Sequence, residues 1–266
     1  MSPSTSNHYL RALRNFMRWM IRNRRVRQDP LVGLRLLKVT TADRKRRRRN
    51  LPDDEMAALV AAAKRSPEPF MGLPGPDRAM LYIVAANTGL RASELASLTP
   101  KSLDLTSPMP TVRCLGAYTK NGEEAVLPLR PDVADMLREW LAGRPAGKRL
   151  WDGEWASRRH GAEMIHIDPA SPRLRRAGLT AADIDYEDAH GRVADFHALR
   201  HTFISNLARA GVHPRNAQAL ARHSTIDLTM NVYTHVAMAD LATDIRKLPA
   251  VPDATGATMG EPGQLA

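Results

Sequence analysis

The chain has 266 residues, of which 43% are hydrophobic and 25% charged, as in an ordinary soluble globular protein. Its longest apolar runs, near residues 57–63 and 79–86, are too short to span a membrane, and the N-terminus lacks the apolar core of a secretion signal. The single cysteine, Cys114, excludes an internal disulfide and a cysteine-rich zinc site. We therefore expect a cytoplasmic protein.

The net charge of +11 is concentrated at one end of the chain. Residues 1–50 hold 15 basic and 2 acidic side chains, whereas the remaining residues hold 24 basic and 26 acidic ones. A local cationic block of this kind is typical of proteins that bind a polyanion. Nucleic acid is a better candidate than membrane lipid, because the block has few aromatic residues outside one helix face.

The first predicted element is a helix over residues 5–27. Apolar residues recur there at spacings of three and four, and arginines occupy much of the remaining surface. Asp29-Pro30 is expected to end it, since the residue before proline disfavours the α conformation. Nothing else in the first 40 residues offers this apolar stripe a partner, so it either docks on the later domain or belongs to helices that this chain lacks.

A basic run closes the linker that follows. It consists of Arg44, Lys45, Arg46, Arg47, Arg48 and Arg49. Such a run is often a solvated tail, but its position between two structured segments favours a strap lying on DNA phosphates.

From residue 51 onward the pattern predicts one compact domain, mainly α-helical with a small antiparallel β-sheet (α+β). Helices are expected at 53–65, 77–87, 91–97, 131–142, 169–177, 197–210, 214–222 and 237–247. Strands are expected near 111–114 and 124–129, joined by a turn at Asn121-Gly122. The tail over 249–266, rich in proline, glycine, alanine and threonine, is expected to be disordered.

Two motifs place basic side chains where a phosphate could bind. In TGLRASEL (88–95), Arg91 lies at a predicted helix start, where its guanidinium group adds to free backbone N–H groups. Glu94, one turn later, could orient Arg91, although such a pair is more often a surface salt bridge. In TKNGEEAVLPL (119–129), Lys120 lies at the tip of the predicted hairpin and could reach a ligand.

Two later motifs add histidines, an arginine and a tyrosine. HALRHTF (197–203) places His197, Arg200 and His201 on one helix face, which suits phosphate better than a metal because an arginine would repel a divalent cation. LARHSTIDLTMNVYTH (220–235) carries His223 and, ten residues later, Tyr233.

Together these residues fit phosphoryl transfer without a metal or any cofactor. Arginines neutralise the charge of a pentavalent phosphorus and keep their protons. A tyrosine is a nucleophile that leaves a covalent phospho-intermediate. A flexible lysine can protonate the leaving oxygen.

The sequence resembles the tyrosine recombinase (phage integrase) family. The family pattern is an arginine in T-G-x-R-x-x-E, a hairpin lysine, H-x-x-R-H, a histidine in L-G-H-S, and a tyrosine in Y-x-H. Residue by residue, the resemblance assigns the catalytic roles to Arg91, Lys120, His197, Arg200, His223 and Tyr233. Glu94 and His201 would be supporting residues, and the pattern extends over about residues 51–247.

The resemblance also implies a domain organisation. Residues 1–28 would be the last helix of an N-terminal core-binding (SAM-like) domain whose other helices are absent. Residues 29–50 would be the basic linker, 51–248 the catalytic domain, and 249–266 the tail.

Two features depart from the family pattern. Arg222 stands where the family usually has glycine, next to His223. The spacing from His223 to Tyr233 is also one residue longer than in common members, so the sequence leaves open whether Tyr233 acts in its own subunit or in a neighbouring one.

The resemblance implies a site-specific recombinase of a mobile element that acts on double-stranded DNA through a 3′-phosphotyrosine. It further implies a tetramer on the DNA, an accessory DNA-bending protein and a nucleoid-associated location. Two alternatives remain open at this point, namely an inactive or regulatory DNA-binding fragment and a DNA-relaxing activity like that of type IB topoisomerases. A metal nuclease would need His197, His201, His223 or His235 to converge, and no carboxylate cluster supports it.

Overall fold

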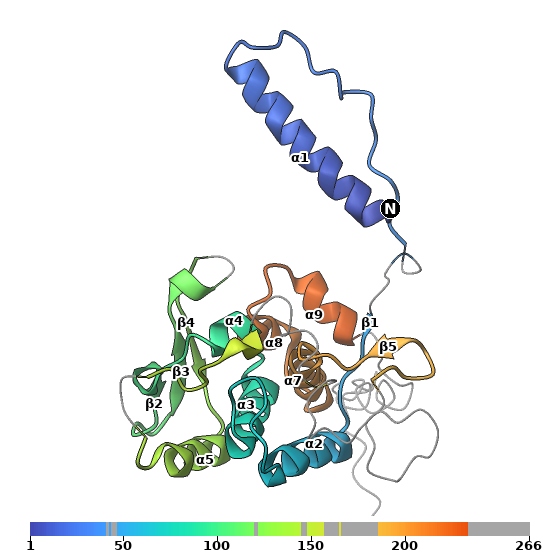
Figure 1. Cartoon of the computed structure of the whole chain (residues 1–266). Coiled ribbons are helices and arrows are strands. Elements are labelled where there is room, and N and C mark those ends of the chain that lie inside the picture. The colour runs from blue at the N-terminus through green and yellow to red at the C-terminus, as the bar shows by residue number, and fades with distance from the viewer. Residues whose placement is uncertain are drawn as a thin grey trace, which may run out of the picture. The chain divides into compact units, whose positions relative to one another are not determined.

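The computed structural model describes residues 1–40, 43, 47–119, 122–144, 148–156, 165 and 186–233 (Figure 1). Its α-helices are α1 (Pro3–Arg22), α2 (Asp53–Arg65), α3 (Gly75–Thr88), α4 (Ala92–Leu95), α5 (Pro131–Leu141), α7 (Ala198–Arg209), α8 (Pro214–Ala221) and α9 (Ile226–Tyr233). Its strands are β1 (Arg47–Arg48), β2 (Leu103–Asp104), β3 (Thr111–Cys114), β4 (Ala125–Pro128) and β5 (Arg192–Val193). Short 3-10 helices lie at Pro100–Ser102, Gly116–Tyr118 and Glu154–Ala156.

The described residues form two compact units that alternate along the sequence. One unit comes from Met1–Met80 and Trp151–Leu199, and the other from Leu81–Leu150 and the chain after Arg200. The dividing points fall within α3 and α7, so each of these helices contributes residues to both units.

In the first unit, the segment after α1 folds back along that helix. The side chain of Asn7 donates to the backbone oxygen of Leu37 and accepts from its N–H group, both at 2.8 Å. Half of the apolar stripe stays exposed, including Tyr9, Leu13 and Phe16. The first 40 residues therefore give α1 a partner that the sequence did not indicate, but this partner covers only part of the stripe.

Helix α1 also ends earlier than residue 27, where the sequence placed its end. Asn23 caps the helix, and Arg24 has a φ of 57°, a left-handed conformation that a continuing α-helix does not allow. The turn after Arg22, and not Asp29-Pro30, therefore terminates the helix.

The basic run leads into a short parallel sheet of the first unit. Arg47 and Arg48 form β1, which pairs with β5 in register with Arg192 and Val193. The core of this unit includes Leu51, Leu59, Trp151 and Trp155, all at most 1% exposed. Regular structure in this unit therefore already includes β1, four residues before residue 51.

In the second unit, β2, β3 and β4 form an antiparallel sheet in that order. The connection from β3 to β4 is tight, because a Cβ atom on Gly116 would collide with the carbonyl oxygen of Gly122. Gly122 itself has a φ of 75°, as expected for the glycine of the predicted turn. Val112 and Leu127 of this sheet and Leu137 of α5 are buried.

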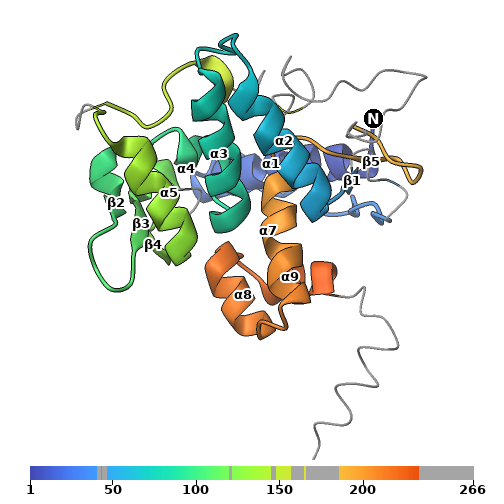
Figure 2. The same cartoon turned by 90° about the horizontal axis from the view of Figure 1, so that it is seen from below.

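The remaining part of the second unit is helical. The end of α7 leads through a turn to α8, and α9 lies beside α8 (Figure 2). Helix α9 was not predicted, since its threonine and asparagine residues favour helices weakly. The helices expected at 169–177 and 237–247, and the tail, lie outside the described residues.

The predicted fold class is confirmed: the described residues are mainly α-helical with small sheets. None of the helices in the described ranges has the length and apolar character of a membrane-spanning segment.

Candidate active site

Arg91 and Glu94 form a pair at the start of α4. Arg91 is the N-cap residue of this helix, and its backbone N–H donates to Glu94 Oε2 at 2.7 Å. Its Nη1 donates to Glu94 Oε1 at 3.0 Å. The Glu94 side chain is 0% exposed, so this pair is not a surface salt bridge. The Arg91 side chain is 30% exposed. Glu94 thus fixes Arg91 while leaving part of its guanidinium group accessible.

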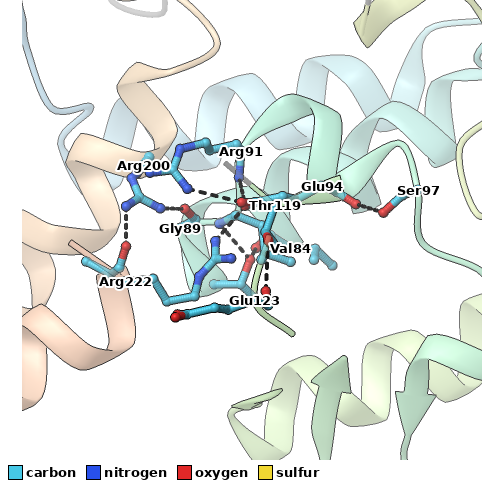
Figure 3. Close-up of polar contacts among 12 residues, drawn as sticks. Val84, Gly89, Arg91, Glu94, Ser97, Thr119, Glu123, Arg200 and Arg222 are labelled. Atoms are coloured by element: carbon cyan, nitrogen blue, oxygen red, sulfur yellow. Dashed lines mark hydrogen bonds and ion pairs between the residues drawn. The ribbon is translucent and has the colours of Figure 1, made fainter. Parts of the chain in front are cut away.

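Arg200 joins two loops of the second unit. It lies on α7, is 3% exposed, and donates to the backbone oxygens of Gly89 and Ala221 (Figure 3). Gly89 is required here, because its φ is 60° and a Cβ atom would lie 2.5 Å from the ring of Phe203. The loop before α4 and the end of α8 are therefore held to the same guanidinium group.

The surroundings of Arg200 alter the pKa of its guanidinium group. Burial, together with the neighbouring charges of Arg91 and Arg222, lowers the pKa of Arg200 to about 10. Arg200 still carries its positive charge at neutral pH. Arg91, Arg200 and Arg222 thus lie close enough to act on one another, and guanidinium groups gathered in this way favour a bound anion.

His223 follows α8 and faces the same cluster. Its Nδ1 lies 3.0 Å from Thr229 Oγ1, and its backbone oxygen accepts from Gln218 Nε2 at 3.2 Å. Burial, with the charges of Arg200 and Arg91, lowers the pKa of His223 to about 4. The imidazole is therefore neutral at pH 7, with one nitrogen protonated and the other able to accept a hydrogen bond.

Arg222, the residue that departs from the family pattern, caps α8 in a left-handed conformation with a φ of 51°. Its Nη2 donates to Glu94 Oε2 at 2.5 Å. Glu94 therefore has two arginine partners, Arg91 and Arg222. The sequence predicted the contact with Arg91 but not the contact with Arg222, because Arg222 and Glu94 are 128 residues apart.

Tyr233 is the last residue of α9. Its hydroxyl group donates to the backbone oxygen of Val212 at 2.9 Å. Burial raises the pKa of this hydroxyl above its usual value. A tyrosine in this state is protonated at neutral pH, so it needs a proton acceptor in order to act as a nucleophile.

An open pocket of about 770 Å³ brings several of these side chains to one surface. Arg91, Arg215, Arg222 and His223 line it, together with residues 123–127 of the β3–β4 hairpin. The hairpin was predicted to carry Lys120 toward the ligand. Lys120 itself lies outside the described residues, but the segment that follows it in the hairpin lines this pocket with residues 123–127.

Two further predicted site residues belong to α7 or directly precede it. His197 directly precedes α7, in the first unit, and His201 is half-buried on α7. His201 contributes a positive charge that lowers the pKa of His223, after burial and the two arginines. His235 lies outside the described residues.

The basic run is divided between two situations. Arg44, Lys45 and Arg46 lie outside the described residues, and Arg47 is exposed on β1. Arg48 Nε donates to both carboxylate oxygens of buried Asp195 at 2.8 Å. Arg49 is 6% exposed and pairs with Glu55. Arg48 and Arg49 thus stabilise the fold, a role that the sequence did not suggest for them.

Comparison with known proteins relates the chain to one family. The model of the Phage integrase family matches residues 49–240. The tyrosine recombinase XerA of Saccharolobus solfataricus is 28% identical over 243 residues, which are 91% of this chain and 67% of that protein. XerD of Pseudomonas putida is 30% identical over 254 residues, or 90% of this chain and 73% of that protein. XerC of a Roseiflexus species is 31% identical over 210 residues, or 78% and 62%. The chain thus spans about two thirds of the length of these relatives.

Two solved structures share the fold. The Tn1549 transposon integrase in complex with transposon right end DNA has a TM-score of 0.66 at 20% identity, covering 93% of this chain and 80% of that one. The XerH site-specific recombinase bound to palindromic difH substrate has a TM-score of 0.61 at 17% identity, covering 93% and 68%.

Proposed function

This chain belongs to the phage integrase family of site-specific tyrosine recombinases, and we propose that it cleaves and rejoins double-stranded DNA through a covalent bond to Tyr233. The observation that carries the proposal is the cluster of Arg91, Arg200 and His223. These residues come from separate parts of the sequence, and the charges of Arg91 and Arg200 act together with burial to lower the pKa of His223. Such a cluster suits the phosphate that is attacked.

In the proposed cleavage step, the Tyr233 oxygen attacks a phosphorus of the DNA backbone. A bond forms between this oxygen and phosphorus, giving a 3′-phosphotyrosine, and the bond from phosphorus to the 5′ oxygen breaks. Lys120 donates a proton to this leaving oxygen, which becomes a free 5′-hydroxyl. The reverse reaction with another 5′-hydroxyl rejoins the DNA without an external source of energy, since the phosphodiester is exchanged and not hydrolysed.

The basic residues share the stabilisation of the pentavalent phosphorus. Arg91 and Arg200 neutralise its added negative charge without losing their own protons. Neutral His223 donates a hydrogen bond to a phosphate oxygen or accepts the tyrosine proton, with His197 assisting from the start of α7 and His201 supporting the charge. This chemistry requires no metal, because the arginines supply the positive charge that a metal ion would supply.

Assembly and location follow from the same proposal. Strand exchange between two DNA sites needs more than one active subunit, so the chain is proposed to form a tetramer on DNA, with an accessory DNA-bending protein setting the geometry. A cytoplasmic, nucleoid-associated location suits this activity. The relatives described above are recombinases and an integrase, which favours strand exchange over DNA relaxation or a purely regulatory role.

The test is adduct formation on a nicked suicide duplex carrying the DNA that flanks the gene. The parent protein, with EDTA present, should form a covalent complex that persists on a denaturing gel and leaves a free 5′-hydroxyl. Tyr233→Phe should bind the same DNA and form no adduct, because its ring has no nucleophilic oxygen.

The matched control is Tyr186→Phe, which removes another hydroxyl and should leave the adduct intact. An adduct that persists in Tyr233→Phe would place the nucleophile elsewhere, and loss of the adduct in EDTA would show that a metal takes part.

A further inference from the structure

Arg222 occupies a position that suits glycine. It is one of three non-glycine residues with positive φ in the described part of the chain, and its φ of 51° and ψ of 47° place it in the left-handed region. This conformation is common at helix ends and is least restricted for glycine. An arginine there crowds its own backbone, so the side chain must contribute something that glycine cannot.

The side chain of Arg222 is largely removed from water. It is 15% exposed, and Nη2 donates to Glu94 Oε2 at 2.5 Å. Its Nε is buried and has no hydrogen-bond partner among the described residues. A guanidinium group that gives up hydration for one carboxylate is held tightly at that carboxylate.

Glu94 in turn holds Arg91, through both the backbone N–H and Nη1. One buried carboxylate thus lies between two guanidinium groups. The segment at the end of α8 that contains Arg222 also contains His223 and Ala221, whose backbone oxygen accepts a hydrogen bond from Arg200. The Arg222–Glu94 contact therefore connects the end of α8 to the start of α4. His223 and the acceptor of Arg200 lie at the end of α8, and Arg91 lies at the start of α4.

We propose that Arg222 is a positioning residue for DNA cleavage, acting through Glu94 to orient Arg91 and to keep Arg91's charge available to the attacked phosphate. With Arg222 present, the negative charge of Glu94 is shared by two arginines. With glycine in its place, Arg91 alone would balance Glu94, and less positive charge would face the phosphate. This inference rests on the recombinase activity proposed above.

The charged and titratable groups around Glu94 make the effect of Arg222 measurable. Arg91 and Arg222 bond the carboxylate, Arg200 on α7 lies within electrostatic range, and Cys114 on β3 faces it as a neutral thiol whose pKa burial raises to about 11. Burial alone would raise the pKa of Glu94, but the hydrogen bonds and charges of Arg222 and Arg91 outweigh burial and lower it. Without Arg222, Glu94 should take up its proton at a higher pH than in the parent.

The experiment measures single-turnover cleavage of the suicide duplex by the full chain between pH 5.5 and 8.5. Arg222→Gly suits the left-handed backbone and should fold. We expect its cleavage rate at pH 7 to fall by between about tenfold and a hundredfold, the range for a misplaced catalytic group. Its rate should also begin to decline at a higher pH than the parent's as the solution is acidified.

Further variants distinguish the routes by which Arg222 could act. Arg222→Lys, which keeps the charge, should restore part of the rate. In a Glu94→Gln background, Arg222→Gly should cause little further loss, because both changes break one contact. The matched control, Arg130→Gln, removes an exposed arginine of the same unit that pairs with exposed Asp132, and it should follow the parent throughout.

Three results would overturn the positioning role. One is a parent-like rate and pH profile in Arg222→Gly. Another is full additivity with Glu94→Gln. The third is a slope of log K against log salt that flattens by about 0.9 in Arg222→Gly, since this would show a direct phosphate contact. Adduct formation by the parent protein tests the proposed function separately from this inference. Absence of an adduct in the parent would overturn the recombinase activity itself.

Discussion

Arg200 is 3% exposed and donates to two backbone oxygens, whereas Arg11, Arg18 and Arg22 on α1 are exposed along a helix with no acidic residue in its first turn. The first arginine is fixed in place by the fold around it. The others can move and follow a flexible anion. Position thus limits what each can contribute: a fixed guanidinium group stabilises one charge in one geometry, while a mobile one raises the affinity for any polyanion.

Arg48 and Arg49 resemble the α1 arginines in their sequence position and Arg200 in being held by the fold. They continue the basic run, but their side chains are held by Asp195 and Glu55. A count of positive charges in residues 1–50 therefore overstates the number available to DNA. Whether an arginine is fixed or mobile therefore depends on the acceptors that hold its guanidinium group, which are backbone oxygens for Arg200 and carboxylates for Arg48 and Arg49.

The largest expected effect comes from changing the geometry of a fixed arginine while keeping its charge. Arg200→Lys should lower the single-turnover cleavage rate by about 10²–10³-fold, because one ammonium group cannot serve two carbonyls and a phosphate. The affinity for DNA and its salt dependence should change little. Cleavage on saturating DNA and a binding titration measure the two quantities separately.

Arg209→Lys is the matched control, since Arg209 is exposed at the end of the same helix. It should cleave like the parent. Equal losses in both variants would show that the geometry of Arg200 is not what matters.

A second, smaller effect should come from the mobile arginines. Replacing Arg11, Arg18 and Arg22 with alanine should flatten the slope of log K against log salt by up to about 2.7, if all three neutralise phosphates. The cleavage rate on saturating DNA should stay close to the parent's, since no fixed group has changed. Fluorescence anisotropy at several salt concentrations provides the slope.

A control with the same loss of charge replaces exposed arginines of other elements, namely Arg65, Arg113 and Arg130. Equal flattening in the control would mean that the charge of α1 has no special role, and the comparison between the two regions would fail.

The smallest expected effect concerns Arg48. Arg48→Gln should lower the free energy of unfolding by about 2 kcal/mol, because buried Asp195 loses its charge-assisted donor. Asp195 keeps its hydrogen bond from the N–H of Ala198, at 3.1 Å, which limits the loss. Urea denaturation measures the change. Unaltered stability together with a flatter salt slope would return Arg48 to the DNA-binding set.

The sequence predicted best those parts of the fold that local periodicity specifies. The helix expected at 53–65 is α2 with the same bounds, and α5 and α8 each end one residue before the predicted end. Helix α9 was missed, because Thr229 is buried by packing that no local pattern reveals. The same holds for β1 and β5, two-residue strands that depend on a partner far away in the chain.

Within the candidate site, the motif at 88–95 was enough to predict the Arg91–Glu94 pair, because its partners are three residues apart. The contacts of Arg222 with Glu94 and of Arg48 with Asp195 join residues separated by 128 and 147 positions. Such contacts depend on tertiary packing, and one sequence gives no signal for them. The unusual residue at position 222 marked the place, but its partner emerged only from the fold.

The hydrogen bond from the Tyr233 hydroxyl to the Val212 backbone oxygen keeps this hydroxyl protonated in the protein without DNA. In the cleavage proposed above, the Tyr233 oxygen is a weak nucleophile while its proton is donated to that carbonyl, so this hydrogen bond must break before attack. An enzyme that binds non-target DNA far more often than its target benefits from such a hydrogen bond, because a short-lived complex dissociates before the bond breaks. On this proposal, the loop that carries Val212 helps determine how long the protein must stay on DNA before cleavage.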